Sequence, residues 1–145
     1  MAWRELEEQV IHDRVVTALK KKIFNYPNEK HPNLEVHTNH PIKTHSVSDH
    51  LGGQFYPDLV VLDSRSEKVF SLIEVETLST VNENEAKQWT KFASISENFY
   101  LFFPRGYGAK VKMLCQQISN IHYFRYWQEG EHFQVEHIVD NLDNA

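Results

Sequence analysis

The stretch YPDLVVLD at residues 56–63 decides the fold, together with VFSLIEVET at residues 69–77, which follows after a short polar break. Both runs are rich in β-branched and other apolar residues, as strands are. Gly52 and Gly53 precede the first run, and the polar residues 64–67 separate the two. Two strands joined by a short turn of this kind predict an antiparallel β-hairpin.

Carboxylates interrupt this hairpin at positions where a buried strand is normally apolar. Asp58 stands at the start of the first strand, and Glu74 and Glu76 stand at the end of the second. Residues two apart in a strand share one face, so both glutamates point the same way. In an antiparallel hairpin the start of one strand lies beside the end of the other, and Asp58 should therefore face Glu74 or Glu76. Three acids beside an apolar sheet repel one another and lose hydration, which indicates a divalent metal as the compensating charge.

The composition is that of a globular protein, with 145 residues, 41% hydrophobic and 12% aromatic. This length is expected to form one domain over residues 1–145 with a substantial core. Neither a membrane-spanning run nor a signal peptide is visible, so we expect a cytoplasmic protein without membrane association. The one cysteine, Cys115, excludes an internal disulfide. The net charge of −5 argues mildly against indiscriminate nucleic-acid binding, although a metal and a local basic patch can reverse the sign locally.

The hydrophobic periodicity predicts a mixture of helices and strands along the rest of the chain. We predict helices over residues 2–24, 80–96 and 110–119, and strands over residues 34–38, 56–63, 69–77, 99–103 and 121–127. Thr80 with Glu83 matches a capping box for the second helix. Residues 48–54 read as a polar loop near the acids, and residues 133–139 as a short strand or a tail. The order α-β-β-β-α-β-α-β predicts an α/β class of the α+β kind, with a central mixed sheet flanked by helices.

The first predicted helix carries apolar residues at helical spacing. Two stripes are possible, one through Trp3, Leu6, Val10 and Val16 and the other through Ile11, Val15, Ala18 and Leu19. Glu7 and Glu8 border the buried face in the first half of this helix. Either acid is therefore placed to reach the sheet.

Residues 56–61 and 73–76 in this context resemble the PD-(D/E)xK nuclease superfamily, whose core is restriction-endonuclease-like. The likeness extends over roughly residues 4–103, where the order of helices and strands also matches. The resemblance implies that Asp58 and Glu74 bind Mg²⁺, with Mn²⁺ as a substitute. It further implies that an acid of the first helix, Glu8 or Glu7, assists them.

The chain departs from the family pattern at Glu76, which stands where a lysine is usual. Some members similar to this one carry Glu-x-Glu, and others carry the lysine on the following helix, which here means Lys87 or Lys91. Some exonuclease branches also have a Gln-x-x-x-Tyr signature on that helix, of which Gln88 to Phe92 is a relaxed version. Lys87 also has a structural explanation, because Glu83 precedes it by four residues, a favourable helical pair.

Phosphodiester hydrolysis requires charge neutralisation at the phosphate and a hydroxide formed near neutral pH, and a metal held by carboxylates supplies both. The backbone carbonyl of Val75 lies between the two glutamates and is a further candidate oxygen ligand. Glu76 would either accept a proton from the attacking water or hold a second metal. Lys87 would instead position the water or stabilise charge, and Gln88, the glutamine of the relaxed signature, is a further catalytic candidate.

We therefore expect a metal-dependent nuclease that hydrolyses phosphodiester bonds of DNA. The alternative is a catalytically inactive module that keeps the nuclease fold and binds nucleic acid or protein within a larger complex. A homodimer or a protein partner would supply the surface for substrate choice. A histidine-bound zinc is disfavoured, because His37, His40, His45 and His50 are irregularly spaced and no His-Glu-x-x-His pattern occurs.

Overall fold

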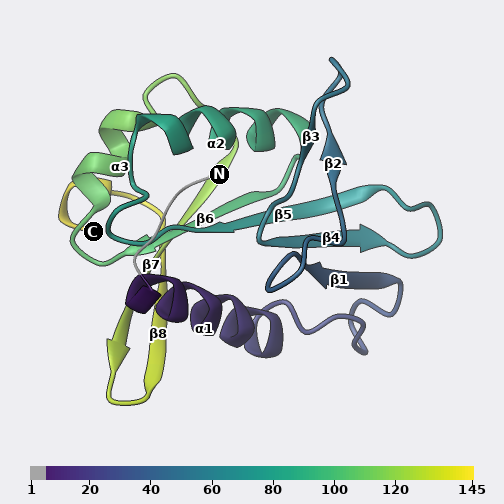
Figure 1. The fold of residues 1–145 in the computed structure, drawn as a ribbon, viewed down its shortest axis with the longest axis horizontal. Coiled ribbons are helices and arrows are strands. Elements are labelled where there is room, and N and C mark those ends of the chain that lie inside the picture. The colour runs from purple at the N-terminus through teal and green to yellow at the C-terminus, as the bar shows by residue number, and fades with distance from the viewer. Residues whose placement is uncertain (1–5) are drawn as a thin grey trace.

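The computed structural model describes residues 6–145, which form a six-stranded sheet, a small two-stranded sheet and three α-helices (Figure 1). The helices are α1 (Leu6–Lys22), α2 (Glu83–Ile95) and α3 (Gly108–Leu114). The strands are β1 (Leu34–Thr38), β2 (Val47–Ser48), β3 (Gln54–Phe55), β4 (Leu59–Asp63), β5 (Val69–Val75), β6 (Phe99–Pro104), β7 (Ile121–Glu129) and β8 (His132–Ile138), and a 3₁₀ turn η1 (Leu142–Asn144) follows. The expected first turn of the N-terminal helix, including Trp3, lies outside the described residues.

The large sheet is mixed, with the strand order β1-β4-β5-β6-β7-β8. The predicted hairpin is present as the antiparallel pair β4–β5, in which Leu59 is opposite Ile73. Strands β5, β6 and β7 are parallel and are connected through α2 and α3, whereas β1 and β8 pair antiparallel at the two edges. A mixed sheet with helices confirms the predicted class.

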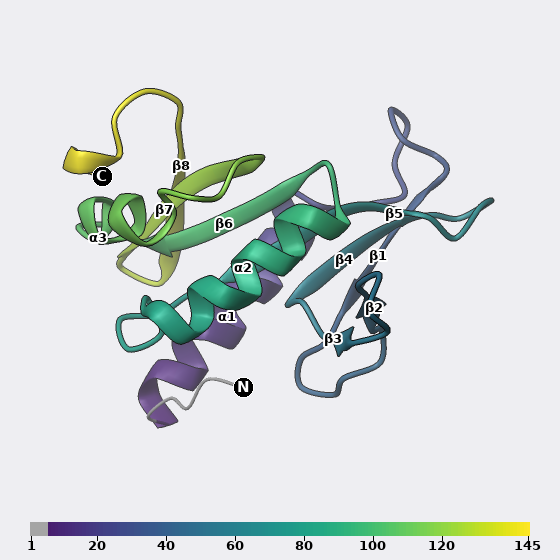
Figure 2. The ribbon, with the colours of Figure 1, turned by 90° about the horizontal axis from the view of Figure 1, so that it is seen from above.

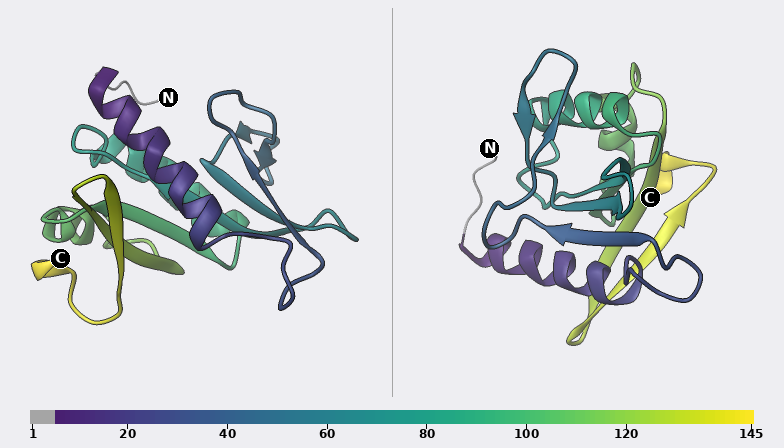
Figure 3. Two further views of the ribbon diagram at one scale, coloured as in Figure 1. Left: turned by 90° about the horizontal axis from the view of Figure 1, so that it is seen from below. Right: turned by 90° about the vertical axis from the view of Figure 1, so that its right-hand side faces the viewer.

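Helices cover both faces of the sheet. Figure 3 shows α1 on one face and α2 on the other, and Figure 2 shows α2 and α3 in front of the sheet with α1 behind it. Alternate hairpin residues serve the two layers, because successive strand side chains point to opposite faces. Val60 and Leu72 pack in the core under α2, while Val61 and Ile73 pack in the core over α1. Because of this alternation, Glu74 follows Leu72 onto the α2 side.

The buried face of α1 follows the second predicted stripe, in which Val15 and Leu19 are buried and Ile11 is partly buried against the same core, and it extends to His12 and Val16. Leu6 and Val10 are exposed, and the buried residues are His12, Val15, Val16 and Leu19. These four have the i, i+3, i+4, i+7 spacing of one helix face. A histidine thus takes the place of an apolar residue at the N-terminal end of the stripe.

Several predicted boundaries also need correction. The N-cap of α2 is Asn82, whose side chain accepts a hydrogen bond from the Glu85 backbone N–H, so the predicted capping box at Thr80 is wrong. Residues in the predicted loop 48–54 belong in part to the β2–β3 hairpin, and residues 132–138 form the edge strand β8. Among residues 6–145, no helix combines the length and the apolar character needed to cross a membrane.

Candidate metal centre

The hairpin brings Asp58 and Glu74 together, as the sequence predicts. The backbone N–H of Asp58 donates to Glu74 Oε1 at 2.8 Å, and the backbone N–H of Val75 donates to Asp58 Oδ2 at 2.7 Å. Both side chains are nearly buried, with 5% exposure for Asp58 and 7% for Glu74. These reciprocal bonds follow from the register, because the pair Leu59–Ile73 places the preceding residue opposite the following one. The two carboxylates are therefore held by local backbone geometry.

Glu76 lies deeper than Glu74 and is fully buried. The Trp89 indole N–H donates to Glu76 Oε2 at 2.6 Å, and the Thr80 hydroxyl donates to Oε1 at 2.7 Å. Thr80, expected to cap α2, therefore serves this carboxylate instead. Glu76 is thereby connected to α2 and to the turn before it.

Glu85 completes an acidic cluster with Glu74 and Glu76. Each of the three buried residues offers one carboxylate oxygen, and these oxygens lie within 4.8 Å of one another. Glu85 was not predicted from the sequence. Its signal is the helical spacing to Trp89 and Phe92, both of which are buried, so that Glu85 lies on the inner face of α2.

The ionisation of these acids differs between the two sides of the hairpin. Burial, with the nearby charges of Asp58 and Glu76, raises the pKa of Glu74 well above its ordinary value. Burial and Glu85 raise the pKa of Glu76 to about 8, although its hydrogen bonds from Trp89 and Thr80 oppose the rise. Burial would also raise the pKa of Asp58, but the positive charges and hydrogen bonds of two histidines outweigh burial and lower it. The cluster therefore favours either protons or a cation at the glutamates.

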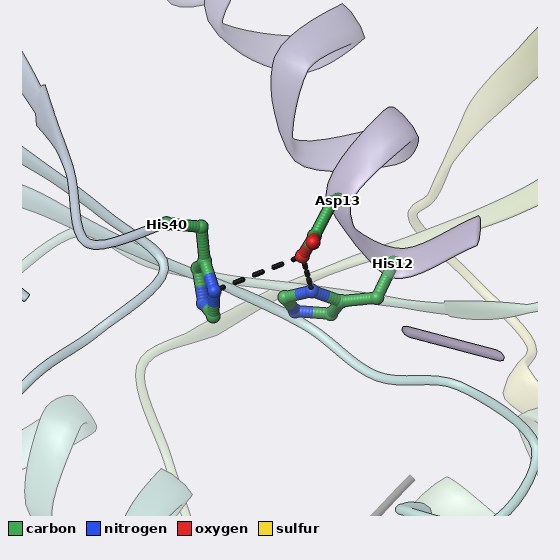
Figure 4. Close-up of side chains that lie close together, drawn as sticks. All are labelled: His12, Asp13 and His40. Carbon is green, nitrogen blue, oxygen red and sulfur yellow. Dashed lines mark hydrogen bonds and ion pairs between the residues drawn. The ribbon is translucent and has the colours of Figure 1, made fainter. Parts of the chain in front are cut away.

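The two histidines beside Asp58 are His12 of α1 and His40, which follows β1 (Figure 4). His12 Nε2 lies 3.1 Å from Asp58 Oδ1, and His40 Nε2 contacts the same oxygen. On the other side of both rings lies Asp13, whose Oδ1 is 2.9 Å from His12 Nδ1 and 3.7 Å from His40 Nδ1. His12 was missed as a functional candidate, and only its place in the buried stripe of α1 marks it in the sequence.

An open cleft of about 410 Å³ gives access to these groups. Its lining includes Asp58, Glu74, Glu85, Gln88, His40 and Lys43. Gln88 thus lines the same cleft as Asp58 and Glu74. Lys43, from the segment between β1 and β2, is the lysine of this lining, and its Nζ lies 5.3 Å from the ring centre of Tyr56.

Other predicted site residues lie elsewhere. Lys87 is exposed and lines a separate hollow with Met113 of α3, so its proposed place beside the acids is wrong. Lys91 pairs with Asp49 at 3.4 Å. Glu8 does not join the acids, because its carboxylate accepts hydrogen bonds from the backbone N–H and the hydroxyl of Ser79, both at 2.8 Å. Glu8 and His12 are four residues apart and lie on the same face of α1, so the position of the helix along its axis places His12 beside Asp58 and Glu8, one turn earlier, beside Ser79.

Comparison with known proteins identifies no matching family model and no matching curated protein. Among solved structures, the chain is similar to the YaeQ protein from Pseudomonas syringae, with 21% sequence identity and a TM-score of 0.46. The match covers 85% of this chain and 57% of that protein. The chain thus spans little more than half the length of this structural neighbour.

Proposed function

We propose that this protein is a metal-dependent nuclease that hydrolyses phosphodiester bonds of DNA on a restriction-endonuclease-like core. The observation that carries the proposal is the pairing of Asp58 with Glu74 across the hairpin, beside an open cleft. Glu74 is nearly buried beside the carboxylates of Asp58 and Glu76, an arrangement that a bound cation would stabilise. The sequence resemblance of the same residues supports the reading of this cleft as a phosphodiesterase site.

The donor set fits a hard divalent cation. Carboxylate and carbonyl oxygens are the ligands that Mg²⁺ takes in proteins, usually with several waters. Asp58 and Glu74 would hold Mg²⁺, or Mn²⁺ in its place, with the Val75 carbonyl as a further oxygen. The raised pKa of Glu74 agrees with a place that prefers a bound positive charge. When bound, the metal would neutralise phosphate charge and favour ionisation of a water near neutral pH.

The chain's own residues then act in three ways. Asp58 is held ionised by His12 and His40, and its orientation is set by the Val75 N–H. Gln88 and Lys43 line the cleft, where an amide and an ammonium group would bind the non-bridging phosphate oxygens. Glu76 is fully buried and hydrogen-bonded to Trp89, which favours a role in positioning β5 against α2 over proton transfer with cleft water.

The test is DNA cleavage by purified protein with Mg²⁺ or Mn²⁺. We expect Asp58→Ala and Glu74→Gln to reduce cleavage at least about 100-fold, since each removes charge from the metal ligands. Glu97→Gln is the matched control, because Glu97 is exposed and follows α2. Equal cleavage by wild type and Asp58→Ala would show that the activity is a contaminant and would refute the proposal.

The second candidate is an inactive module that keeps the nuclease fold and binds nucleic acid or protein. The observation in its favour is the combination of Glu76 buried in the core with Lys87 outside the cleft, where the family places a lysine next to the metal. DNA binding with no cleavage under any divalent metal, weakened by Lys43→Ala, would support this alternative for a nucleic-acid partner.

A further inference from the structure

A second group of potential metal ligands lies beside the carboxylate pair and draws on three separate segments. His12 comes from α1, His40 from the segment after β1, and Asp58 from the residue before β4. His12 Nε2 and His40 Nε2 both contact one atom, Asp58 Oδ1, and the two ring centres are 4.6 Å apart. Two imidazole nitrogens and one carboxylate oxygen thus converge on one point (Figure 4 shows the two rings).

Hydrogen-bond donors are too few for this arrangement if both rings are neutral. A neutral imidazole has one N–H and one acceptor nitrogen. His12 has a carboxylate oxygen beside each ring nitrogen, with Nδ1 2.9 Å from Asp13 Oδ1 and Nε2 3.1 Å from Asp58 Oδ1, and His40 Nε2 contacts Asp58 Oδ1 as well. A neutral His12 that donates to Asp13 therefore turns an acceptor nitrogen toward a carboxylate. A metal ion between that nitrogen and Asp58 Oδ1 would relieve this repulsion.

The surroundings have the features of an outer shell around metal ligands. Metal-binding histidines commonly donate their second N–H to a carboxylate, which fixes the tautomer and the ring orientation. Asp13 takes this place for His12, whose Nδ1 lies 2.9 Å from Asp13 Oδ1, whereas His40 Nδ1 is 3.7 Å away and beyond hydrogen-bond distance. The other oxygen of Asp58 is held by the Val75 N–H at 2.7 Å.

The segment that carries His40 is also fixed. The buried amide of Asn39 donates to the Pro57 carbonyl at 2.7 Å and to the His45 carbonyl at 2.8 Å, and it accepts from the backbone N–H groups of Thr44 and His45. These bonds attach residues 39–45 to Pro57, which precedes Asp58 and β4. His40 is thereby positioned by the fold before any ligand arrives, a requirement for a tight site.

We propose that His12, His40 and Asp58 bind a transition-metal ion of the Mn²⁺, Co²⁺ or Zn²⁺ class, with Asp13 as the supporting carboxylate. Imidazole nitrogens select these ions over Mg²⁺, which prefers oxygen donors and retained waters. Three protein ligands leave further coordination positions, and His40 and Asp58 line the cleft through which water or substrate would reach them. The histidine site and the proposed nuclease site share Asp58, so this inference rests on the proposed function. It changes the metal of that function from Mg²⁺ to an ion that imidazole binds.

The test is metal binding by the full chain, measured by calorimetry and by the visible absorption of bound Co²⁺. We expect one equivalent of Co²⁺ to bind the wild type with an absorption band typical of nitrogen ligation. His40→Gln should lower the affinity at least about 100-fold, and Asp13→Asn about 10–100-fold, as loss of outer-shell partners does. His45→Gln is the control, since His45 stacks on His37 with ring centres 3.6 Å apart and does not contact Asp58.

His40 and Asp13 are chosen because they are partly exposed, whereas His12 is fully buried and its replacement endangers folding. A thermal-melting series provides a second readout, because Zn²⁺ should raise the melting temperature of the wild type and not of His40→Gln. Absence of Co²⁺ binding by the wild type, or equal binding by His40→Gln, would overturn the inference.

The failure of this inference is distinguishable from failure of the proposed nuclease. Cleavage of DNA with Mg²⁺ by a protein that binds no Co²⁺ would overturn the histidine site and leave the nuclease intact. Conversely, Co²⁺ binding that depends on His40, in a protein that cuts no DNA with any divalent metal, would support the histidine site and overturn the nuclease.

Discussion

Asp58 and Glu76 are both buried carboxylates at one end of the same hairpin, yet their surroundings drive ionisation in opposite directions. Two histidines contact Asp58 and lower its pKa, although burial acts to raise it. Glu76 is near Glu85 and receives hydrogen bonds from Trp89 and Thr80, and its pKa is raised to about 8. Burial alone therefore does not decide the charge of an acid here. The charge depends on which side chains the neighbouring segments of the chain place beside the acid.

The largest expected change in unfolding free energy comes from removing Asp58, the ionised carboxylate of the two. Asp58→Ala deletes the common partner of His12, His40 and the Val75 N–H. Breaking a buried ion pair by removing one partner typically costs about 3–5 kcal/mol, and we expect a loss of unfolding free energy of this size in urea denaturation at pH 7. Asp143→Ala, which removes an exposed pair with Lys112, is the control and should cost at most about 1 kcal/mol. Equal losses for the two variants would contradict the distinction.

The pH dependence of stability should separate the two sides of the hairpin. The pKa of Glu76 is higher in the folded protein than its unfolded-state pKa of about 4.5. The contribution of this group to stability is therefore fully present below about pH 4.5 and is lost as the pH rises toward the folded-state pKa. For Glu76 the unfolding free energy should therefore fall as the pH rises from about 5 to 8, by on the order of 1 kcal/mol per pH unit. Glu74 should add a fall of the same sign. Asp58 acts oppositely, because its lowered pKa makes stability decline as the pH falls below about 4.

Urea denaturation across this pH range, without divalent metal, measures the slope. Glu76→Gln should flatten it, since the amide does not ionise, whereas Glu97→Gln should leave it unchanged. Addition of Mn²⁺ should also flatten the slope, because a bound cation favours the ionised acids. A stability that rises between pH 5 and 8 in the metal-free protein would contradict the raised pKa values.

A smaller effect should follow from removing the donor that holds Glu76. Trp89→Phe keeps most of the aromatic volume but deletes the 2.6 Å hydrogen bond to Oε2. Loss of a partner to a buried polar group costs about 1–3 kcal/mol of unfolding free energy. The cost should be greater at pH 9, where Glu76 is ionised, than at pH 5, where it is protonated. Trp127→Phe is the matched control, because its indole bonds an exposed Glu129 at 3.3 Å. If Trp89→Phe lowers the unfolding free energy equally at pH 5 and pH 9, the hydrogen bond does not stabilise the ionised form of Glu76.

The smallest effect is expected at a residue that lies outside both environments. Lys87→Ala removes an exposed side chain on the α3 side of α2, and the change in unfolding free energy should stay within about 0.5 kcal/mol. DNA cleavage should be unchanged as well. Lys43→Ala, by contrast, removes the ammonium group from the cleft and should weaken DNA binding. A large loss of cleavage in Lys87→Ala would restore this residue to the site.

The hairpin and its acids could be predicted because they depend on local pattern. Residues 56–63 and 69–77 are apolar runs separated by a short polar turn, which predicts the hairpin, and the pairing of its strands places Asp58 beside Glu74. The orientation of α1 could not be predicted in the same way, since two apolar stripes competed and the buried one includes a histidine. The direction in which Lys87 points from α2 could not be predicted either, because the packing of the helix on the sheet decides which of its faces is buried.

By itself, then, the sequence determined the strand pair and the pairing of two carboxylates, which follow from the pattern of residues 56–77, and the class of the fold, which follows from the order of elements along the chain. The tertiary structure alone decided which other groups meet them. His12 and His40 reach Asp58 through packing of segments that lie far apart in the chain, and Glu85 reaches Glu76 because α2 packs back against the sheet that precedes it. The physical reason is that strand alternation is a local steric property, whereas the rotation of a helix is set by the total surface it buries against the sheet.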